Sequence, residues 1–257
     1  MADPGSAGEE LWDLERLAGA KGLGDWMFSL FSGHARGTVA EVGAGIGTYS
    51  RRLLDAGVDH LLAIEPEPAC AEALERRVGA DPRVTVARET LPGSPALARL
   101  AGSCQLVVCQ NVLEHISDDG AAVTAMAAAL APGGRLTLLV PAHPRLYGRL
   151  DCRYGHFRRY DRARLRALIA GAGLELCELR SFNAIGVAGW WAKNRGGEPA
   201  LDERSLRVYE ALLKLWRPLE ERFRPPFGLS LVAQAQRRGA ARPPPAGGAQ
   251  PPPPISP

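Results

Sequence analysis

Short apolar runs alternate with stretches of helical periodicity between residues 38 and 182, and this alternation limits the fold more than any other feature. The runs are rich in Val, Leu and Ile and lack strict polar alternation, which is typical of strands buried on both faces of a parallel sheet. Strands that alternate with helices predict a doubly wound α/β fold. The expected strands are 38–42, 60–64, 83–87, 105–110, 135–140 and 174–179.

Three segments lie outside this alternation. We expect residues 1–37 to form an N-terminal helical cap, and residues 239–257, which hold eight prolines, to be a disordered tail. Within the main domain of residues 38–238 we expect a helical insertion at about 184–224. The strand that follows at 229–235 is reached through this long excursion, so we expect it to lie antiparallel at the edge of the sheet.

The composition is that of an ordinary soluble protein, with 257 residues of which 46% are apolar and 23% charged. No apolar run reaches the ~18 residues that a membrane-spanning helix needs, and the acidic N-terminus lacks the pattern of a secretory signal. The five cysteines form no C-x-x-C pair, so we expect neither a disulfide framework nor a structural metal. These features predict a cytoplasmic protein.

Positive charge is concentrated in one segment, although the net charge is only +3. Residues 145–166 hold eight arginines, and only Asp151 and Asp161 oppose them. A nucleic-acid-binding protein usually carries a broader basic surface, so we expect no nucleic-acid partner. The segment fits either a localised anionic ligand or an exposed, solvated helix face.

The stretch from Val39 to Thr48 combines a buried strand, three glycines and the start of a helix. Glycines let the backbone turn sharply and approach a ligand, and the helix N-terminus offers unpaired N–H groups. Dinucleotide enzymes use the spacing G-x-G-x-x-G, whereas this loop reads G-x-G-x-G and follows Glu41. Glu41 repels a pyrophosphate and attracts a cation such as a sulfonium amino acid. Glu65, at the end of the next strand, can accept the hydroxyls of a ribose.

Four motifs, in this order, resemble the class I S-adenosylmethionine-dependent methyltransferases. They are E-V-G-A-G-I-G-T at 41–48, A-I-E-P at 63–66, C-Q-N-V-L-E-H-I at 109–116 and L-A-P-G-G-R-L at 130–136. The resemblance implies a Rossmann-like fold with a mostly parallel, seven-stranded sheet. It also implies S-adenosyl-L-methionine as the cofactor and methyl transfer as the reaction.

The resemblance assigns the cofactor-binding residues to the ends of four strands. The first acid and the three glycines are expected to hold the methionine end, Glu65 the ribose and Glu89 the adenine. Gln110 and Asn111 are expected beside the transferred methyl group. The complete set is Glu41, Gly43, Gly45, Gly47, Glu65, Glu89, Gln110 and Asn111.

The twenty residues after the fifth strand are too many for an ordinary turn, which indicates a functional loop. An oxygen or nitrogen acceptor must lose a proton during methyl transfer, and histidine is the commonest base. We therefore expect His143 or His156 to act as the base, with Tyr160 as a further catalytic residue. Arg158 and Arg159 are expected to shape the acceptor site.

The elements P-A-H-P, G-H-F-R-R-Y and P-P-F-G-L-S are similar to those of one methyltransferase subgroup. Members of that subgroup often occur with glycosyltransferases that use lipid carriers. The resemblance therefore implies a small-molecule acceptor that is anionic, a sugar or lipid-linked, and O-methylation with a histidine base.

The sequence leaves three questions open. Glu114, His115 and His156 resemble the E-x-x-E-H … H arrangement of metal-dependent O-methyltransferases, although Asn111 replaces the first carboxylate. A non-catalytic S-adenosylmethionine-binding partner that regulates a neighbouring biosynthetic enzyme also fits an intact glycine loop. Residues 186–195, which include two tryptophans, fit either a lid packed on the domain or a contact with lipid.

Overall fold

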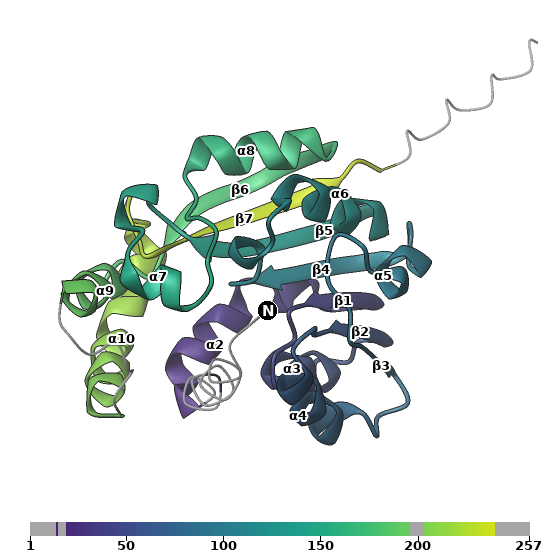
Figure 1. Ribbon diagram of the computed structural model, residues 1–257, viewed down its shortest axis with the longest axis horizontal. Helices are drawn as coiled ribbons and strands as arrows, with labels where there is room; N and C mark the ends of the chain where they lie inside the picture. Colours follow the sequence, from purple (N-terminus) through teal and green to yellow (C-terminus); the bar gives the residue numbers. More distant parts are fainter. Residues whose placement is uncertain (1–13, 15–18, 196–202, 240–257) are drawn as a thin grey trace, which may run out of the picture.

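The computed structural model describes residue 14, residues 19–195 and residues 203–239. A seven-stranded sheet in the order β3-β2-β1-β4-β5-β7-β6 runs through the molecule (Figure 1). Its strands are β1 (Thr38–Val42), β2 (His60–Ile64), β3 (Val84–Ala87), β4 (Cys104–Gln110), β5 (Leu130–Pro141), β6 (Leu174–Phe182) and β7 (Ser230–Arg237). The pairs among β1 to β5 are parallel, and β7 is antiparallel to both of its neighbours. This confirms the doubly wound, mostly parallel α/β fold.

The apolar runs locate the central strands closely. β1 and β2 match the predicted bounds residue for residue, and each is buried over its last four residues. β5 begins earlier than predicted, at Leu130, which pairs with Cys104 before a shift in register. Gly133, with a φ of 80°, lies within this irregular first part of the strand.

The prediction that the last strand lies at the sheet edge is wrong. β7 lies between β5 and β6, and β6 forms the edge. The reason is visible in burial: successive β7 residues Leu231 and Val232 belong to the apolar cores on opposite faces of the sheet. β6 carries the exposed Glu175, a polar residue that an edge strand tolerates.

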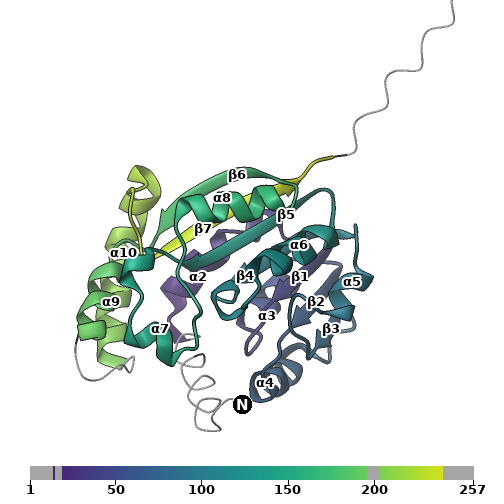
Figure 2. The same cartoon turned by 45° about the horizontal axis from the view of Figure 1, so that its top comes forward.

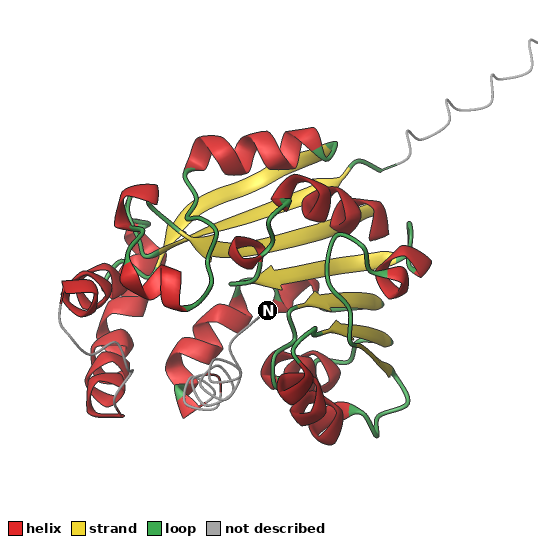
Figure 3. Ribbon diagram, in the orientation of Figure 1, coloured by secondary structure: helices red, strands yellow, loops and turns green. Residues whose placement is uncertain are grey.

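Helices cover both faces of the sheet (Figure 3). One face packs against α5 (Pro95–Arg99), α6 (Asp119–Ala129) and α8 (Arg162–Gly171). The other face packs against α2 (Lys21–Ser29), α3 (Thr48–Asp55), α4 (Pro68–Val78) and α10 (Glu203–Phe223). Side chains cap several of these helices at their first turn; Asp118 accepts a hydrogen bond from Ala121 N–H, for example.

Further helices lie beyond the carboxyl ends of the parallel strands. They are α7 (Arg149–Arg153), α9 (Gly186–Arg195) and the short 3₁₀ turns η2 (Leu113–His115) and η3 (Pro144–Leu146). A third 3₁₀ turn, η1 (Ser32–His34), precedes β1. Figures 1 and 2 both show α7, α9 and α10 at the end of the sheet to which the parallel strands point. α9 and α10 fall within the range of the predicted insertion.

The described part of the predicted N-terminal cap is tied to the rest of the chain by hydrogen bonds. The carboxylate of Glu210 on α10 accepts the backbone N–H groups of Gly22 and Leu23 at 2.8 and 3.0 Å. The buried Trp26 ring packs on Phe182 with ring centroids 4.1 Å apart. The predicted proline-rich tail lies outside the described residues from position 240 onward. Among the described helices, none is both long and apolar enough to cross a membrane.

Candidate functional site

The glycine loop joins the carboxyl end of β1 to α3. Gly43, Gly45 and Gly47 have φ values of 74°, 54° and 79°, which residues with a Cβ adopt at a cost. A Cβ at Gly43 would overlap the Val112 side chain, which follows β4. The loop therefore needs glycine both for its backbone conformation and for its approach to the neighbouring strand end.

Glu41 lies beneath this loop and is only 4% exposed. Burial raises the pKa of its carboxyl group to about 8, although the Ser50 hydroxyl donates to it at 2.5 Å and favours the charged form. The nearby charge of Glu65 raises the pKa further. A buried acid of this kind gains most from a positively charged ligand group, because such a group stabilises the ionised form.

Glu65 also lies at the edge of the loop, at the end of β2. Its two carboxylate oxygens accept backbone N–H groups, one from Gly45 at 2.8 Å and one from Glu67 at 3.0 Å. Each carboxylate oxygen has a second lone pair, so Glu65 can still accept ribose hydroxyls. Burial raises the pKa of Glu65, and the two backbone hydrogen bonds oppose this rise.

Glu89, the predicted adenine contact, follows β3. Its carboxylate accepts the Ser94 hydroxyl and the Ala96 N–H, the latter at 2.9 Å, and thereby caps α5. These hydrogen bonds lower the pKa of Glu89. The described contacts thus give Glu89 a structural role at a helix terminus, and its contact with adenine remains a prediction.

Gln110 and Asn111 lie where β4 ends. Both polar atoms of the Gln110 side chain are buried, and neither has a partner among the described residues. An unsatisfied buried amide costs free energy unless a ligand or water completes it. Asn111 has a φ of 52°, and its backbone N–H donates to Leu139 at 2.8 Å. The loop glycines, the two buried acids and the open amide of Gln110 therefore fit a cofactor with a cationic end and a hydroxylated sugar.

Glu114, His115 and His156 come together just beyond this strand end. The rings of the two histidines are perpendicular, with centroids 4.7 Å apart. Desolvation and the charge of His156 lower the pKa of His115 to about 4. Glu114 is 1% exposed, and burial raises its pKa to about 8.

Asp151 orients His156. Its Oδ1 atom lies 2.8 Å from His156 Nδ1, and the Nε–H of Arg159 donates to both carboxylate oxygens, at 2.8 and 2.9 Å. The Gly148 N–H adds a further bond at 3.0 Å. Although burial disfavours its charge, the bonds from His156 and Arg159 lower the pKa of Asp151. The Arg159 guanidinium also lies 4.4 Å from the centre of the Trp190 ring on α9, which supports a packed lid at this position.

Tyr160 and Arg158 both donate hydrogen bonds to backbone carbonyls, and their predicted roles, Tyr160 in catalysis and Arg158 at the acceptor site, remain predictions. Tyr160 is fully buried, and its hydroxyl donates to the Leu113 carbonyl at 3.1 Å, so the group is occupied inside the core. Arg158 donates to the carbonyls of Ile116 and Ser117. Arg159 is 3% exposed and holds Asp151, which in turn contacts His156, and its predicted role at the acceptor site remains a prediction.

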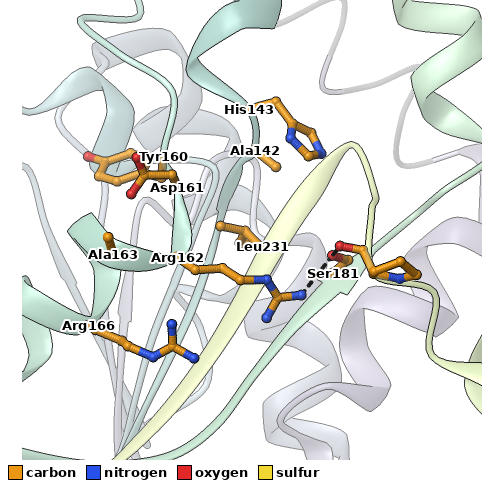
Figure 4. A pocket seen from close by; sticks show the side chains of 10 residues that line it. Ala142, His143, Tyr160, Asp161, Arg162, Ala163, Arg166, Ser181 and Leu231 are labelled. Carbon is orange, nitrogen blue, oxygen red and sulfur yellow. Dashed lines mark hydrogen bonds between the residues drawn. The ribbon is translucent and has the colours of Figure 1, made fainter.

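His143 does not lie in this cluster. It follows β5 with a φ of 60° and lines a separate cavity between α8 and β7 (Figure 4). The two histidines that the sequence treats as equal candidates for the base therefore have different surroundings, and only His156 has a carboxylate partner among the described contacts.

The described residues include one group that fits a divalent ion. One ligand atom from each of Glu114, His115 and His156 lies within 4.8 Å of the others. Glu114 Oε2 is buried without a partner in the described part of the chain, which leaves a carboxylate oxygen for an ion. One carboxylate and two imidazoles suit a divalent transition metal. Asn111 stands where the sequence motif has its first carboxylate, so this chain offers a neutral side chain at that position.

Sequence reasoning missed Asp151 as a site residue. It was visible only as one of two acids among eight arginines, a segment whose charge suggested an anionic ligand or a solvated face. A buried acid in a strongly basic segment is a usable signal, because its burial requires a partner.

Comparison with known proteins agrees with this geometry. Residues 22–179 match the family described as a methyltransferase domain. A ubiquinone biosynthesis O-methyltransferase of Xylella fastidiosa (strain 9a5c) is 34% identical over 103 residues, which are 38% of this chain and 39% of that protein. The chain thus matches about two fifths of the length of this curated relative.

Two solved structures share the fold at low identity. The first is a putative sarcosine dimethylglycine methyltransferase from Galdieria sulphuraria, with a TM-score of 0.56, 14% identity and 85% coverage of both chains. The second is a phosphoethanolamine N-methyltransferase 2 from Haemonchus contortus in complex with S-adenosyl-L-methionine. Its TM-score is 0.52 at 16% identity, covering 79% of this chain and 49% of that one. Together with the matched family, the sheet order and the glycine loop show that the chain belongs to the class I S-adenosylmethionine-dependent methyltransferases.

Proposed function

We propose that the protein transfers a methyl group from S-adenosyl-L-methionine to an oxygen atom of a small-molecule acceptor, with His156 as the general base. The 2.8 Å contact between His156 and Asp151 carries this proposal. When bound, the cofactor supplies an activated methyl group on a positively charged sulfur. The protein must then align the acceptor, exclude water and remove the acceptor proton.

The residues of the chain divide this work between them. Glu41 and the glycine loop bind the charged end of the cofactor, and Glu65 accepts the ribose hydroxyls. The Nδ1–H of His156 is bonded to Asp151, so the lone pair of His156 lies on Nε2. Nε2 is therefore the atom that takes up the acceptor proton. The Asp151 carboxylate stabilises the imidazolium that results, as in other His–Asp pairs.

A divalent ion at Glu114, His115 and His156 is a second candidate for the same step. The unpartnered Glu114 oxygen and the 4.8 Å grouping of ligand atoms favour it. Such an ion would lower the pKa of an acceptor hydroxyl and so replace a protein base. Treatment with a chelator distinguishes the protein base from the metal ion, because it abolishes methyl transfer only if the ion is required.

The O-methylation and the small acceptor rest on similarity as well as geometry. The relative from Xylella is named an O-methyltransferase, and an oxygen acceptor needs the base that His156 provides. We favour an enzyme over a non-catalytic cofactor-binding partner, because a mere binding protein has no use for an oriented His–Asp pair. The predicted anionic, sugar or lipid-linked character of the acceptor belongs to this proposal.

Transfer of labelled methyl groups into fractionated cell extracts, followed by mass spectrometry of the product, tests the function. His156→Gln is expected to reduce transfer at least about a hundredfold, the usual contribution of a general base. His60→Gln, at the exposed start of β2, is the matched control and is expected to retain activity. Cofactor binding without transfer into any fraction would instead support the non-catalytic alternative.

A further inference from the structure

A cavity of about 430 Å³ lies between the start of α8 and strand β7, on the face of the sheet that α6 and α8 cover. Polar side chains that line it include His143, Arg162, Arg166 and Ser181, and Pro226 and Leu231 add apolar wall. Figure 4 shows the guanidinium groups of both arginines extending from α8 toward β7, with the His143 ring at the other end. The volume is within the range of small-ligand sites, which is roughly 300–1,000 Å³.

Arg162 is held in place with donors to spare. Its guanidinium donates to the Leu179 carbonyl at 2.7 Å and to the Ser181 hydroxyl oxygen at 3.0 Å. Ser181 in turn donates to the Pro226 carbonyl at 2.9 Å. All these partners are uncharged and a guanidinium has five N–H donors, so the Arg162 charge is not neutralised and N–H groups remain available.

Arg166 is exposed, and its side chain makes no hydrogen bond or ion pair within the described part of the chain. The acid beside it, Asp161, also lines the cavity, but its carboxylate accepts the Arg164 N–H at 2.7 Å and caps α8. In Figure 4 the Asp161 carboxylate points away from the two cavity arginines. The cavity therefore holds two guanidinium charges that no adjacent carboxylate pairs with.

The positive charges of the α8 arginines lie near the N-terminus of that helix, where positive charge is unfavourable. Arg162, Arg164 and Arg166 all lie within the first half of α8, whose N-terminal end is positive by its dipole and favours anions. Arg164 is compensated by Asp119, at 2.8 Å. The other two are not, and an anion between them would pair with both guanidinium groups.

We propose that this cavity binds a phosphate group. A phosphate carries up to two negative charges and three acceptor oxygens, which matches two guanidinium groups with free donors. That this phosphate belongs to the methyl acceptor rests on the function proposed above, whereas anion binding by the cavity does not. The phosphate belongs either to a water-soluble molecule or to a lipid headgroup. Phe227, which follows the lining residue Pro226 in the chain, is an apolar side chain that is 51% exposed.

Titration calorimetry of the full chain with inorganic phosphate and with glycerol phosphate tests the site. Flotation with phosphatidic acid vesicles, set against neutral phosphatidylcholine vesicles, forms the lipid arm. Arg166→Gln is expected to weaken phosphate binding at least about tenfold, because it removes charged hydrogen bonds. Arg166→Lys keeps the charge and is expected to retain most of the binding. Arg76→Gln, which removes an exposed arginine on α4, is the matched control and is expected to bind as the unaltered protein does.

Each result decides the proposal. Binding of soluble phosphate that depends on Arg166 supports the site with a soluble source, and binding of anionic vesicles alone supports it with a lipid source. No binding in either arm, or equal binding by Arg166→Gln, overturns it. Affinity for S-adenosyl-L-methionine is measured in parallel and is expected to be the same in all variants. Phosphate binding without methyl transfer would leave the anion site intact and count against the proposed reaction only.

Discussion

His156 Nδ1 lies 2.8 Å from Asp151 Oδ1, and the same carboxylate takes two hydrogen bonds from the Nε–H of Arg159. The His156 side chain is 11% exposed and that of Asp151 is fully buried, so little water competes for the contact. Because an ionised carboxylate accepts but cannot donate, the contact fixes the hydrogen of the imidazole on Nδ1. The arrangement sets both the tautomer and the direction of Nε2.

Asp151→Asn is expected to reduce kcat by at least about a hundredfold with little effect on cofactor affinity. An amide can donate to Nδ1, which stabilises the wrong tautomer and removes the charge that supports the imidazolium. A lower kcat at unchanged cofactor affinity is an effect that loss of packing alone does not produce. Measurement of kcat and of cofactor affinity, with thermal unfolding as a check on folding, tests this. An unchanged kcat would remove Asp151 from the mechanism.

Glu65→Ala is expected to weaken S-adenosyl-L-methionine binding by about 1.5–3 kcal/mol, which is about 10- to 150-fold. The variant loses the acceptor of the ribose hydroxyls and also the hydrogen bond to Gly45 that holds the loop. Calorimetry gives the affinity directly. Glu72→Ala, at an exposed position on α4, controls for loss of a negative charge. Equal affinity in both variants would mean that the ribose binds elsewhere.

Cofactor affinity is expected to increase as the pH rises toward about 8. The reason is that the pKa of Glu41 is raised to about 8, so its carboxyl group is protonated at lower pH. A cationic ligand binds the ionised form more tightly and is therefore favoured above the pKa. Glu41→Gln is expected to reduce affinity at high pH and to flatten this part of the profile. Titrations at several pH values measure it. An equally steep profile in Glu41→Gln would assign the pH dependence to another group.

Gly43→Ala is expected to destabilise the protein by more than Gly57→Ala. Both glycines have positive φ, 74° and 88°, so each alanine pays a conformational cost of about 1–2 kcal/mol. A Cβ at position 57 meets open space, whereas at position 43 it overlaps Val112. Urea unfolding of both variants separates the two costs. Val112→Ala in the Gly43→Ala background is expected to recover part of the difference, and its failure to do so would locate the cost elsewhere.

The central strands and the cofactor loop were predictable because each depends on nearby residues. A strand buried on both faces needs a mostly apolar run; β1 ends where the glycine loop begins, and β2 ends before Glu65. The loop needs glycine at positions with positive φ, and the spacing of Gly43, Gly45 and Gly47 records this directly. The position of β7 in the sheet was predicted wrongly, because its apolar residues indicate that it is buried but do not indicate which strands lie beside it.

The roles of the polar residues after β5 were not predictable in the same way. His143, His156 and Tyr160 all follow β5 in the sequence, yet His143 and the buried Tyr160 line one cavity, whereas His156 meets Asp151. Their partners belong to other turns and strands, such as the Leu113 carbonyl after β4, so no local pattern records them.

By itself, the sequence determined the α/β fold, the glycine loop and the two acids expected to bind a cationic cofactor. These features depend on hydrophobic periodicity and on the conformational freedom of glycine, both of which are set within a few neighbouring residues. Only the tertiary structure decided that Asp151 orients His156 and that Glu114 reaches the same cluster. It also separated the arginines of one basic segment, pairing Arg159 with a buried acid and leaving Arg166 without one. The reason is that a charged side chain takes its role from whichever group folding brings within hydrogen-bond distance, and that choice depends on contacts between strand ends far apart in the chain.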